Sequence, residues 1–145
     1  MSNPFTALPN LDFSAELPTS FTLGPSAAWL DTAQTQLAAI ERLSVGCDSH
    51  VSESPDGPTI HRARVLLACL AKASSLPKPH IHPTPAGGVQ FEWEKGARYF
   101  EIELTSPREA QLYFQDRQAG REEEATLHDG DSLEPVFRYL QQVLI

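Results

Sequence analysis

The residues best suited to chemistry in this sequence are the glutamates of two neighbouring apolar stretches, 89–94 and 99–104. Successive residues of an extended chain face opposite sides, so the alternation places one set of side chains on a single face: Glu92, Glu94, Tyr99, Glu101 and Glu103. Carboxylates can act as acid and base or bind a metal. Neither stretch contains a histidine or an aspartate to join them, and exposed carboxylates have no evident cause for a perturbed pKa. We interpret this face as a solvated sheet surface or a binding surface for a cationic partner, in preference to an active site.

Two histidines lie two positions apart, at His80 and His82, on the same side of an extended chain. Two imidazoles could begin a zinc site, which needs three or four ligands. His50, Cys47 or Asp48 could supply the others, but nothing in the spacing requires it. We keep these as weak metal candidates and expect no cofactor.

The run Cys47-Asp48-Ser49-His50 contains a thiol and an imidazole. A nucleophilic thiol needs a base that the fold positions, and close neighbours on a loop seldom point at one another. The pair Gly87-Gly88 lacks the Lys-Ser/Thr ending of a phosphate loop and precedes a strand. We therefore expect a protein that is not an enzyme, with a small metal- or cysteine-dependent enzyme as the alternative.

Two helices are expected in the first half of the chain. Apolar residues recur at steps of three and four in 26–43 and again in 58–76. Pro58 suits the first turn of the second helix, and Pro77 and Pro79 are expected to end it. The cations of that helix are expected to face water: Arg62, Arg64 and Lys72.

The second half predicts antiparallel strands. A turn at Lys95-Gly96 would pair Phe91 with Phe100 and Glu92 with Tyr99. Two further strands are expected around 110–114 and 125–127, joined by a turn from 116 to 120.

A last helix should follow the capping-box-like pair Asp131 and Glu134. The predicted fold class is α+β: two N-terminal helices, an antiparallel sheet of about four strands and a C-terminal helix, with the helices on one sheet face.

The length of 145 residues predicts one domain, which we place at 25–145. Residues 1–24 contain three prolines among scattered apolar residues and are expected to form an extended strap or tail. Phe5, Leu8 and Phe13 in this segment are expected to contribute a second, apolar contact with a partner.

The charge is −8 and uneven: residues 1–86 have a net charge of −2, and residues 87–145 have −6. An acidic second half argues against nucleic-acid binding and against docking on anionic lipid, and permits a basic protein partner. Two cysteines make no disulfide framework, and the first residues lack the pattern of a secretory signal. A cytoplasmic location is therefore expected.

The run PTPAGGVQFEW, followed by YFEIEL, resembles a signature of small bacterial proteins. In that family a helix often leads into a Gly-Trp-Asp-Gly loop, whereas this chain has Gly46-Cys47-Asp48-Ser49 there and lacks the Trp and the second Gly. The resemblance covers about residues 26–104 and implies no particular chemistry. Some members of the family lie in toxin–antitoxin or defence-like gene neighbourhoods.

Together, the patterns favour a non-enzymatic protein-interaction module that binds a basic protein. The resemblance implies an antitoxin- or immunity-like protein, or an accessory subunit of a toxin–antitoxin or defence system. The other alternative is a structural subunit of a larger complex, whose apolar interface would survive high salt.

Overall fold

The computed structural model describes residues 27–46, 55–73, 75–128 and 130–144 of the chain. The fold is of the α+β class, as predicted from the sequence. Its elements, in chain order, are α2 (Leu30–Gly46), α3 (Gly57–Leu70), β1 (His80–Pro83), β2 (Val89–Lys95), β3 (Arg98–Ser106), β4 (Glu109–Asp116), β5 (Arg121–His128) and α4 (Glu134–Leu144). The expected strap at 1–24 lies outside the described residues.

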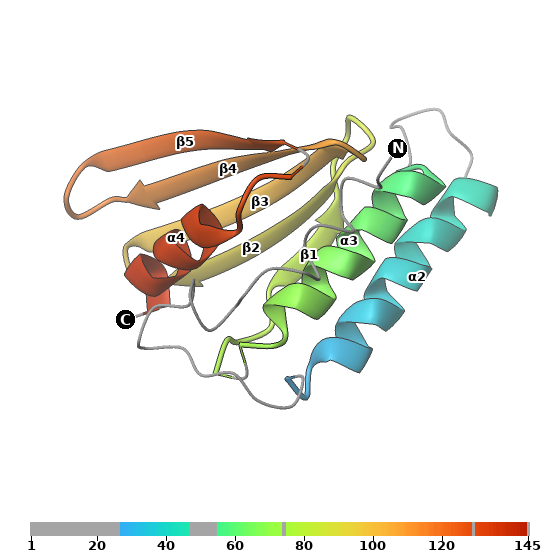
Figure 1. Ribbon diagram of the computed structural model, residues 1–145, viewed down its shortest axis with the longest axis horizontal. Coiled ribbons are helices and arrows are strands. Elements are labelled where there is room, and N and C mark those ends of the chain that lie inside the picture. The colour runs from blue at the N-terminus through green and yellow to red at the C-terminus, as the bar shows by residue number, and fades with distance from the viewer. Residues whose placement is uncertain (1–26, 47–54, 74, 129, 145) are drawn as a thin grey trace.

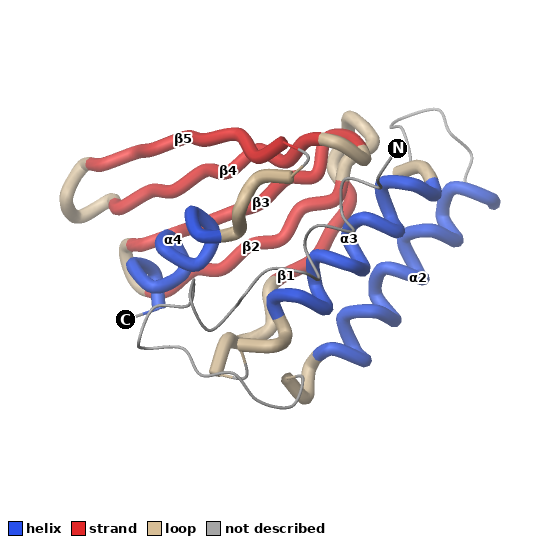
Figure 2. The backbone as a smooth tube through the Cα atoms, viewed as in Figure 1, coloured by secondary structure: helices blue, strands red, loops and turns tan. Residues whose placement is uncertain are grey.

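The strands form one antiparallel sheet in the order β1-β2-β3-β4-β5 (Figure 2). The three helices of the described residues lie on the same side of this sheet (Figure 1). α3 and α4 pack against β2 and β3, while α2 packs against α3 and β1. The alternation of the strands therefore buries one face against the helices and leaves the opposite face to solvent among the described residues.

The sheet has five strands, and the expectation of about four was wrong because β1 was not counted. β1 has only four residues, ends at Pro83 and pairs with β2 alone, which makes it an edge strand. Proline is tolerated on an edge, where its missing N–H costs no ladder hydrogen bond. The prolines around His80–Pro83 therefore made this segment difficult to recognise as a strand in the sequence, although they do not prevent it from pairing.

The predicted register of the β2–β3 hairpin was wrong by two residues. The turn lies at Gly96-Ala97, with Gly96 at φ +61° and Lys95 opposite Arg98. This register places Trp93 opposite Phe100, with ring centroids 6.1 Å apart. The predicted register instead left Trp93 opposite a cation. A shift of two residues preserves the faces of both strands, so the glutamates stay on the predicted side.

Both N-terminal helices have bounds that differ from the prediction. α2 begins at Leu30 because the residues before it tie to the end of α3: Ala27 N–H donates to the Ala71 carbonyl at 2.8 Å. α3 begins after its N-cap Asp56, whose carboxylate accepts from Thr59 N–H at 2.8 Å. It ends at Leu70, well before the prolines, because Ala73 N–H turns back to the Leu70 carbonyl.

The two tryptophans hold the segment between α3 and β1. Trp29 Nε1 donates to the Leu76 carbonyl at 2.7 Å, and Trp93 Nε1 donates to the Pro77 carbonyl at 2.9 Å. The carbonyls of Leu76 and Pro77 lie outside any helix or strand, so the two indoles provide hydrogen-bond donors for them.

The predicted capping-box-like pair of Asp131 and Glu134 does not cap α4. The side chain that meets the first turn is Ser132, whose Oγ accepts from Glu134 N–H at 2.9 Å. Asp131 instead accepts from His128 N–H at 2.7 Å and so ties the loop to the end of β5.

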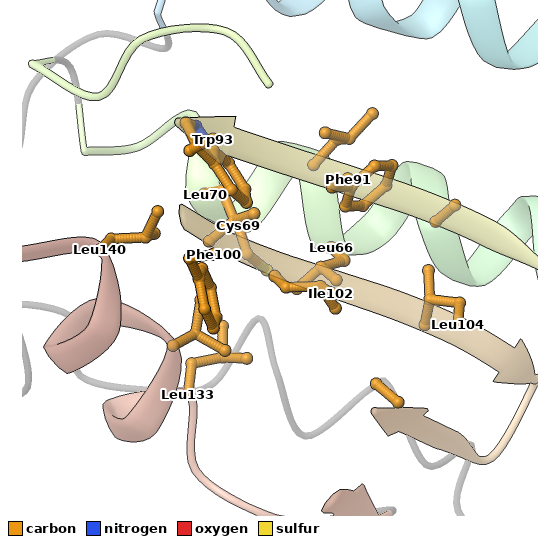
Figure 3. Packing of buried hydrophobic residues seen from close by; sticks show 14 of the residues in the cluster. Leu66, Cys69, Leu70, Phe91, Trp93, Phe100, Ile102, Leu104, Leu133 and Leu140 are labelled. Carbon is orange, nitrogen blue, oxygen red and sulfur yellow. The ribbon is translucent and has the colours of Figure 1, made fainter. Parts of the chain in front are cut away.

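The core joins α2, α3 and α4 to β2, β3 and β4. Figure 3 shows Leu66 and Leu70 of α3 beside Phe100 and Ile102 of β3. Tyr139 of α4 stacks on Phe100 and on Phe114, each with ring centroids 5.3 Å apart. None of the described helices is both long and apolar enough to cross a membrane.

One cation of α3 lies in this interior, contrary to the prediction that it faces water. Arg62 is only 4% exposed. It lines a small pocket together with Leu66 and with Leu133 of the loop before α4, and the aliphatic stem of an arginine can pack on apolar surface of this kind. Arg64 is half-buried and Lys72 is exposed.

Candidate functional site

The candidate site is the sheet face opposite the helices, which we call the outer face. The strand registers assign to it a row of polar side chains that face away from the core: His80, His82, Gln90, Glu92, Glu94, Tyr99, Glu101, Glu103, Gln111, Tyr113, Gln115, Glu122, Glu124 and Thr126. The five residues predicted as the acidic set, Glu92, Glu94, Tyr99, Glu101 and Glu103, all lie here.

Tyr99 is at the centre of a hydrogen-bonded group on this face, the Tyr99 cluster, which consists of His82, Gln90, Glu92, Tyr99 and Glu101. Its hydroxyl donates to Glu101 Oε1 at 2.8 Å and forms a very short contact with Glu92 Oε2. Glu92 and Glu101 are directly opposite one another on β2 and β3. Gln90 Nε2 also donates to Glu92, at 3.1 Å, and His82 Nε2 lies 3.0 Å from the other oxygen of Glu92. Glu92 was predicted opposite Tyr99 and instead reaches it diagonally.

The cluster perturbs the acidities of its members. Partial burial raises the pKa of Glu92, but hydrogen bonds from Tyr99, His82 and Gln90 outweigh it and hold this pKa below its usual range. Partial burial and the two neighbouring carboxylates raise the pKa of Tyr99 far above that of a free tyrosine. Tyr99 is therefore a persistent hydrogen-bond donor here and is not suited to act as a base.

The outer face extends further than the sequence predicted, onto β4 and β5. Tyr113 is opposite Glu101 on one side and Glu124 on the other, and its ring centroid is 6.2 Å from that of Tyr99. Partial desolvation and Glu122 raise the pKa of Tyr113. The sequence contains a signal for this placement: Gln111, Tyr113 and Gln115 alternate with the apolar residues Ala110, Leu112 and Phe114.

The cations of the strands lie on the other side of the sheet. Lys95, Arg98 and Arg121 form one row with Asp116 at the end of β2, β3, β4 and β5. Lys95 Nζ donates to the Leu144 carbonyl at 3.0 Å, Arg98 Nη1 donates to the Gln142 carbonyl at 2.7 Å, and Arg121 contacts the Gln142 side chain. The C-terminus of a helix attracts cations, so α4 gathers the positive charge of the strands and the outer face retains the carboxylates.

Two of the predicted glutamates, Glu94 and Glu103, are not members of the Tyr99 cluster and have other contacts. Glu94 accepts from Arg117 Nη2 at 2.9 Å and is partly neutralised by it. Glu103 is half-buried and lies between Gln90 on β2 and Gln111 on β4, without a carboxylate directly opposite it. The strongest acidic density therefore runs from Glu92 and Glu101 towards Glu124.

The weak metal candidates are not assembled into a metal site in the part of the chain that the structure describes, where no group of three potential ligands occurs. His80 is exposed on β1, and His82 is engaged with Glu92. Cys47 and His50 lie outside the described residues, as do Phe5, Leu8 and Phe13. Cys69 is buried in the core, where burial raises the pKa of its thiol.

A small pocket lies on the helix side, between α3, the β3–β4 turn and the loop before α4. Its lining combines apolar residues such as Leu66 and Leu104 with five charged or ionisable ones: Arg62, Arg108, Glu109, His128 and Asp131. Its volume of about 20 Å³ has room for little more than a water molecule. Both arginines have partners within the structure, and residues of opposite charge balance one another in the lining. This pocket therefore does not define a substrate site.

Comparison with protein-family models, with curated proteins and with solved structures found no match for this chain.

Proposed function

We propose that this protein is a non-enzymatic, cytoplasmic interaction module that binds a basic protein through its outer face. The observation that carries the proposal is the separation of charge across the sheet. Glutamates of β2, β3 and β5 surround two tyrosines on the outer face, while the strand cations pair on the helix side. A face of this kind attracts a basic surface and speeds its encounter.

The tyrosines make such a face better suited to a protein than to a simple ion. Tyrosine provides a large contact area with little loss of side-chain entropy and is enriched at interfaces. Tyr99 and Tyr113 lie side by side between the carboxylates, where a lysine or arginine could contact a ring and a carboxylate together. The sequence resemblance supports a partner encoded nearby, with this protein as its neutraliser or as an accessory subunit.

The test is affinity capture from the native host, eluted in steps of rising salt and read by mass spectrometry. We expect one stoichiometric partner, released by moderate salt because screening weakens association between exposed charges. The variant Glu101→Gln/Glu103→Gln should bind that partner about tenfold more weakly. The control variant Asp31→Asn/Glu134→Gln changes net charge equally on the helices, and it should retain binding.

Three outcomes would contradict this proposal. An equal loss of partner affinity in the control variant would mean that binding depends on the net charge of the protein and not on the outer face. Association that survives high salt would favour a structural subunit with an apolar interface. The absence of any partner at all salt concentrations would overturn the proposal and direct attention to Cys47, His50, His80 and His82, through elemental analysis for zinc and thiol reactivity.

A further inference from the structure

The two edges of the sheet differ in how well they are closed. β1 has four residues, ends in Pro83 and is packed against α2. β5 has eight residues and no proline, and its register with β4 runs without a shift from Arg121 to His128. None of the described strands pairs with the far edge of β5. An edge of this length and regularity is a template for another strand.

One hydrogen bond shows which backbone groups of β5 point outwards. His128 N–H donates to the Asp131 carboxylate at 2.7 Å and so points away from β4. In an antiparallel ladder alternate residues face the same neighbour. The backbone N–H and C=O groups of Glu122, Glu124 and Thr126 must therefore also point away from β4. Asp131 closes this edge at His128, and three residues remain as a ladder for a sixth strand.

The side chains on this edge restrict what can pair with it. Glu122 and Glu124 lie on the outer face beside Tyr113, and both are exposed. Charged side chains on an edge oppose pairing with a second copy, because they would be brought together. The same carboxylates favour an added strand whose lysines or arginines lie on the outer face, where cross-strand pairs of opposite charge stabilise a sheet.

We propose that β5 accepts an extended, basic segment of the partner as a sixth strand. Main-chain hydrogen bonds to Glu122, Glu124 and Thr126 would provide affinity, and alternate cations over the outer face would provide specificity. This inference rests on the proposed function and adds the mode of binding: the partner contributes backbone as well as charge.

The test uses an acetylated and amidated peptide, Lys-Val-Lys-Val-Lys-Val-Lys, and amide hydrogen exchange measured by NMR on the full chain. On saturation with the peptide, the amides of Glu122, Glu124 and Thr126 should exchange at least tenfold more slowly. The amides of Glu123 and Ala125, which face β4, serve as internal controls and should change little. A peptide with glutamate in place of lysine should not bind.

A variant tests the same point through affinity. Thr126→Pro removes one outward N–H that takes no part in pairing with β4, and it should weaken peptide binding at least tenfold. Thr126→Val removes the hydroxyl that donates to Gln111 but keeps the N–H, and it should bind as the wild type does.

The outcomes separate this inference from the proposed function. Peptide binding without protection of the three amides, or binding unaffected by Thr126→Pro in a folded variant, would overturn strand addition and leave a side-chain interface on the outer face. Failure of the lysine peptide to bind would also overturn strand addition. The proposed function itself is decided by partner capture and by the Glu101→Gln/Glu103→Gln variant.

Discussion

Tyr99 has one hydroxyl proton, yet its oxygen lies within hydrogen-bonding distance of two carboxylates. The proton can be donated to only one of them at a time. Since Glu92 and Glu101 are directly opposed, the hydroxyl moderates a repulsion that would otherwise weaken the pairing of β2 with β3. The same arrangement leaves acceptor capacity for a donor from outside, which is what a basic partner would supply.

The variant Tyr99→Phe tests whether the hydroxyl of Tyr99 stabilises the opposed carboxylates of Glu92 and Glu101. It keeps the ring and removes the hydroxyl, so we expect the pKa of Glu92 to rise and the free energy of unfolding at pH 7 to fall by about 1 kcal/mol. A lowered carboxyl pKa contributes stability above the unfolded value, near pH 4.3, which is lost as pH falls through the folded pKa. The cost of Tyr99→Phe should therefore shrink towards pH 3.

Urea unfolding at pH 7 and pH 3, together with an NMR titration of the Glu92 carboxyl, measures both effects. In the background of Glu92→Gln, the pH dependence of the Tyr99→Phe effect should largely disappear. A cost of equal size at both pH values would show that the hydroxyl acts independently of Glu92.

The membership of the acidic face could be predicted from the sequence because it depends only on alternation. A register error of two residues leaves every side chain on its own face, so Glu92, Tyr99 and Glu101 were placed together despite the wrong pairing. The contacts of Tyr113 and His82 could not be predicted, since they depend on which strands are neighbours. The burial of Arg62 could not be predicted either, because its surroundings include residues far away in the sequence, such as Leu104 and Leu133, which line the same pocket.

The turn from Thr84 to Gly88, which joins β1 to β2, is held by hydrogen bonds and by a close backbone contact. Thr84 Oγ1 accepts from Gly88 N–H at 2.9 Å, and Thr84 N–H donates to the Gly88 carbonyl at 3.0 Å. Gly87 has φ +86°, a conformation that side chains disfavour. A Cβ on Gly88 would lie 2.6 Å from the Leu104 carbonyl oxygen. The residues of this run thus have a structural reason: glycine at position 88 allows the start of β2 to lie close against β3.

We expect Gly88→Ala to lower the free energy of unfolding by about 1–3 kcal/mol, because the strained neighbour is backbone and cannot move aside cheaply. Gly57→Ala is the matched control. A Cβ at Gly57 would meet nothing within 4 Å, and alanine at a compatible position stabilises by about 0.4–1 kcal/mol. Thermal or urea unfolding of the two variants checks this, and equal effects would contradict the close approach at Gly88.

Elements were predicted best where periodicity was strong and worst where tertiary contacts set their ends. The strands from β2 to β4 follow period-2 patterns, and the turn predicted at 116–120 lies between β4 and β5, whose closing pair is Asp116 and Arg121. β5 begins at Arg121, four residues before the predicted strand, and its first residues were missed because they carry no apolar alternation. α3 ends at Leu70 although helical periodicity continues, because the chain must turn back to meet Ala27 and both tryptophans. These contacts join residues that are far apart in the sequence, so the residues around Leu70 contain no pattern that would predict where the helix ends.

At the scale of the whole molecule, the sheet separates charges between its two faces. Lys95, Arg98 and Arg121 converge on the end of α4, where they also anchor the last helix to the strands. The outer face consequently has an excess of carboxylates, and its hydroxyl groups are surrounded by them. Tyr139 shares this situation on the helix side, since its hydroxyl donates to Glu123 at 3.1 Å.

This distribution predicts that all three tyrosines of the chain ionise late. Partial burial and nearby carboxylates raise the pKa values of Tyr99, Tyr113 and Tyr139, whereas unfolded tyrosine ionises near pH 10. At pH 10.5 the folded protein should show less tyrosinate absorbance near 295 nm than the chain in guanidinium, which should be more than half ionised.

The same shifts set the sign of the alkaline stability. A group whose folded pKa is raised binds its proton more tightly when folded, so its contribution is fully present below the unfolded pKa and is lost as pH rises through the folded value. The buried thiol of Cys69 has a raised pKa and acts in the same direction. The free energy of unfolding should therefore decline above about pH 8.5, the ordinary cysteine value, and more steeply above pH 10. Tyrosinate that forms with a midpoint of 10 while circular dichroism still reports a folded sheet would contradict the carboxylate environment assigned to these three hydroxyls.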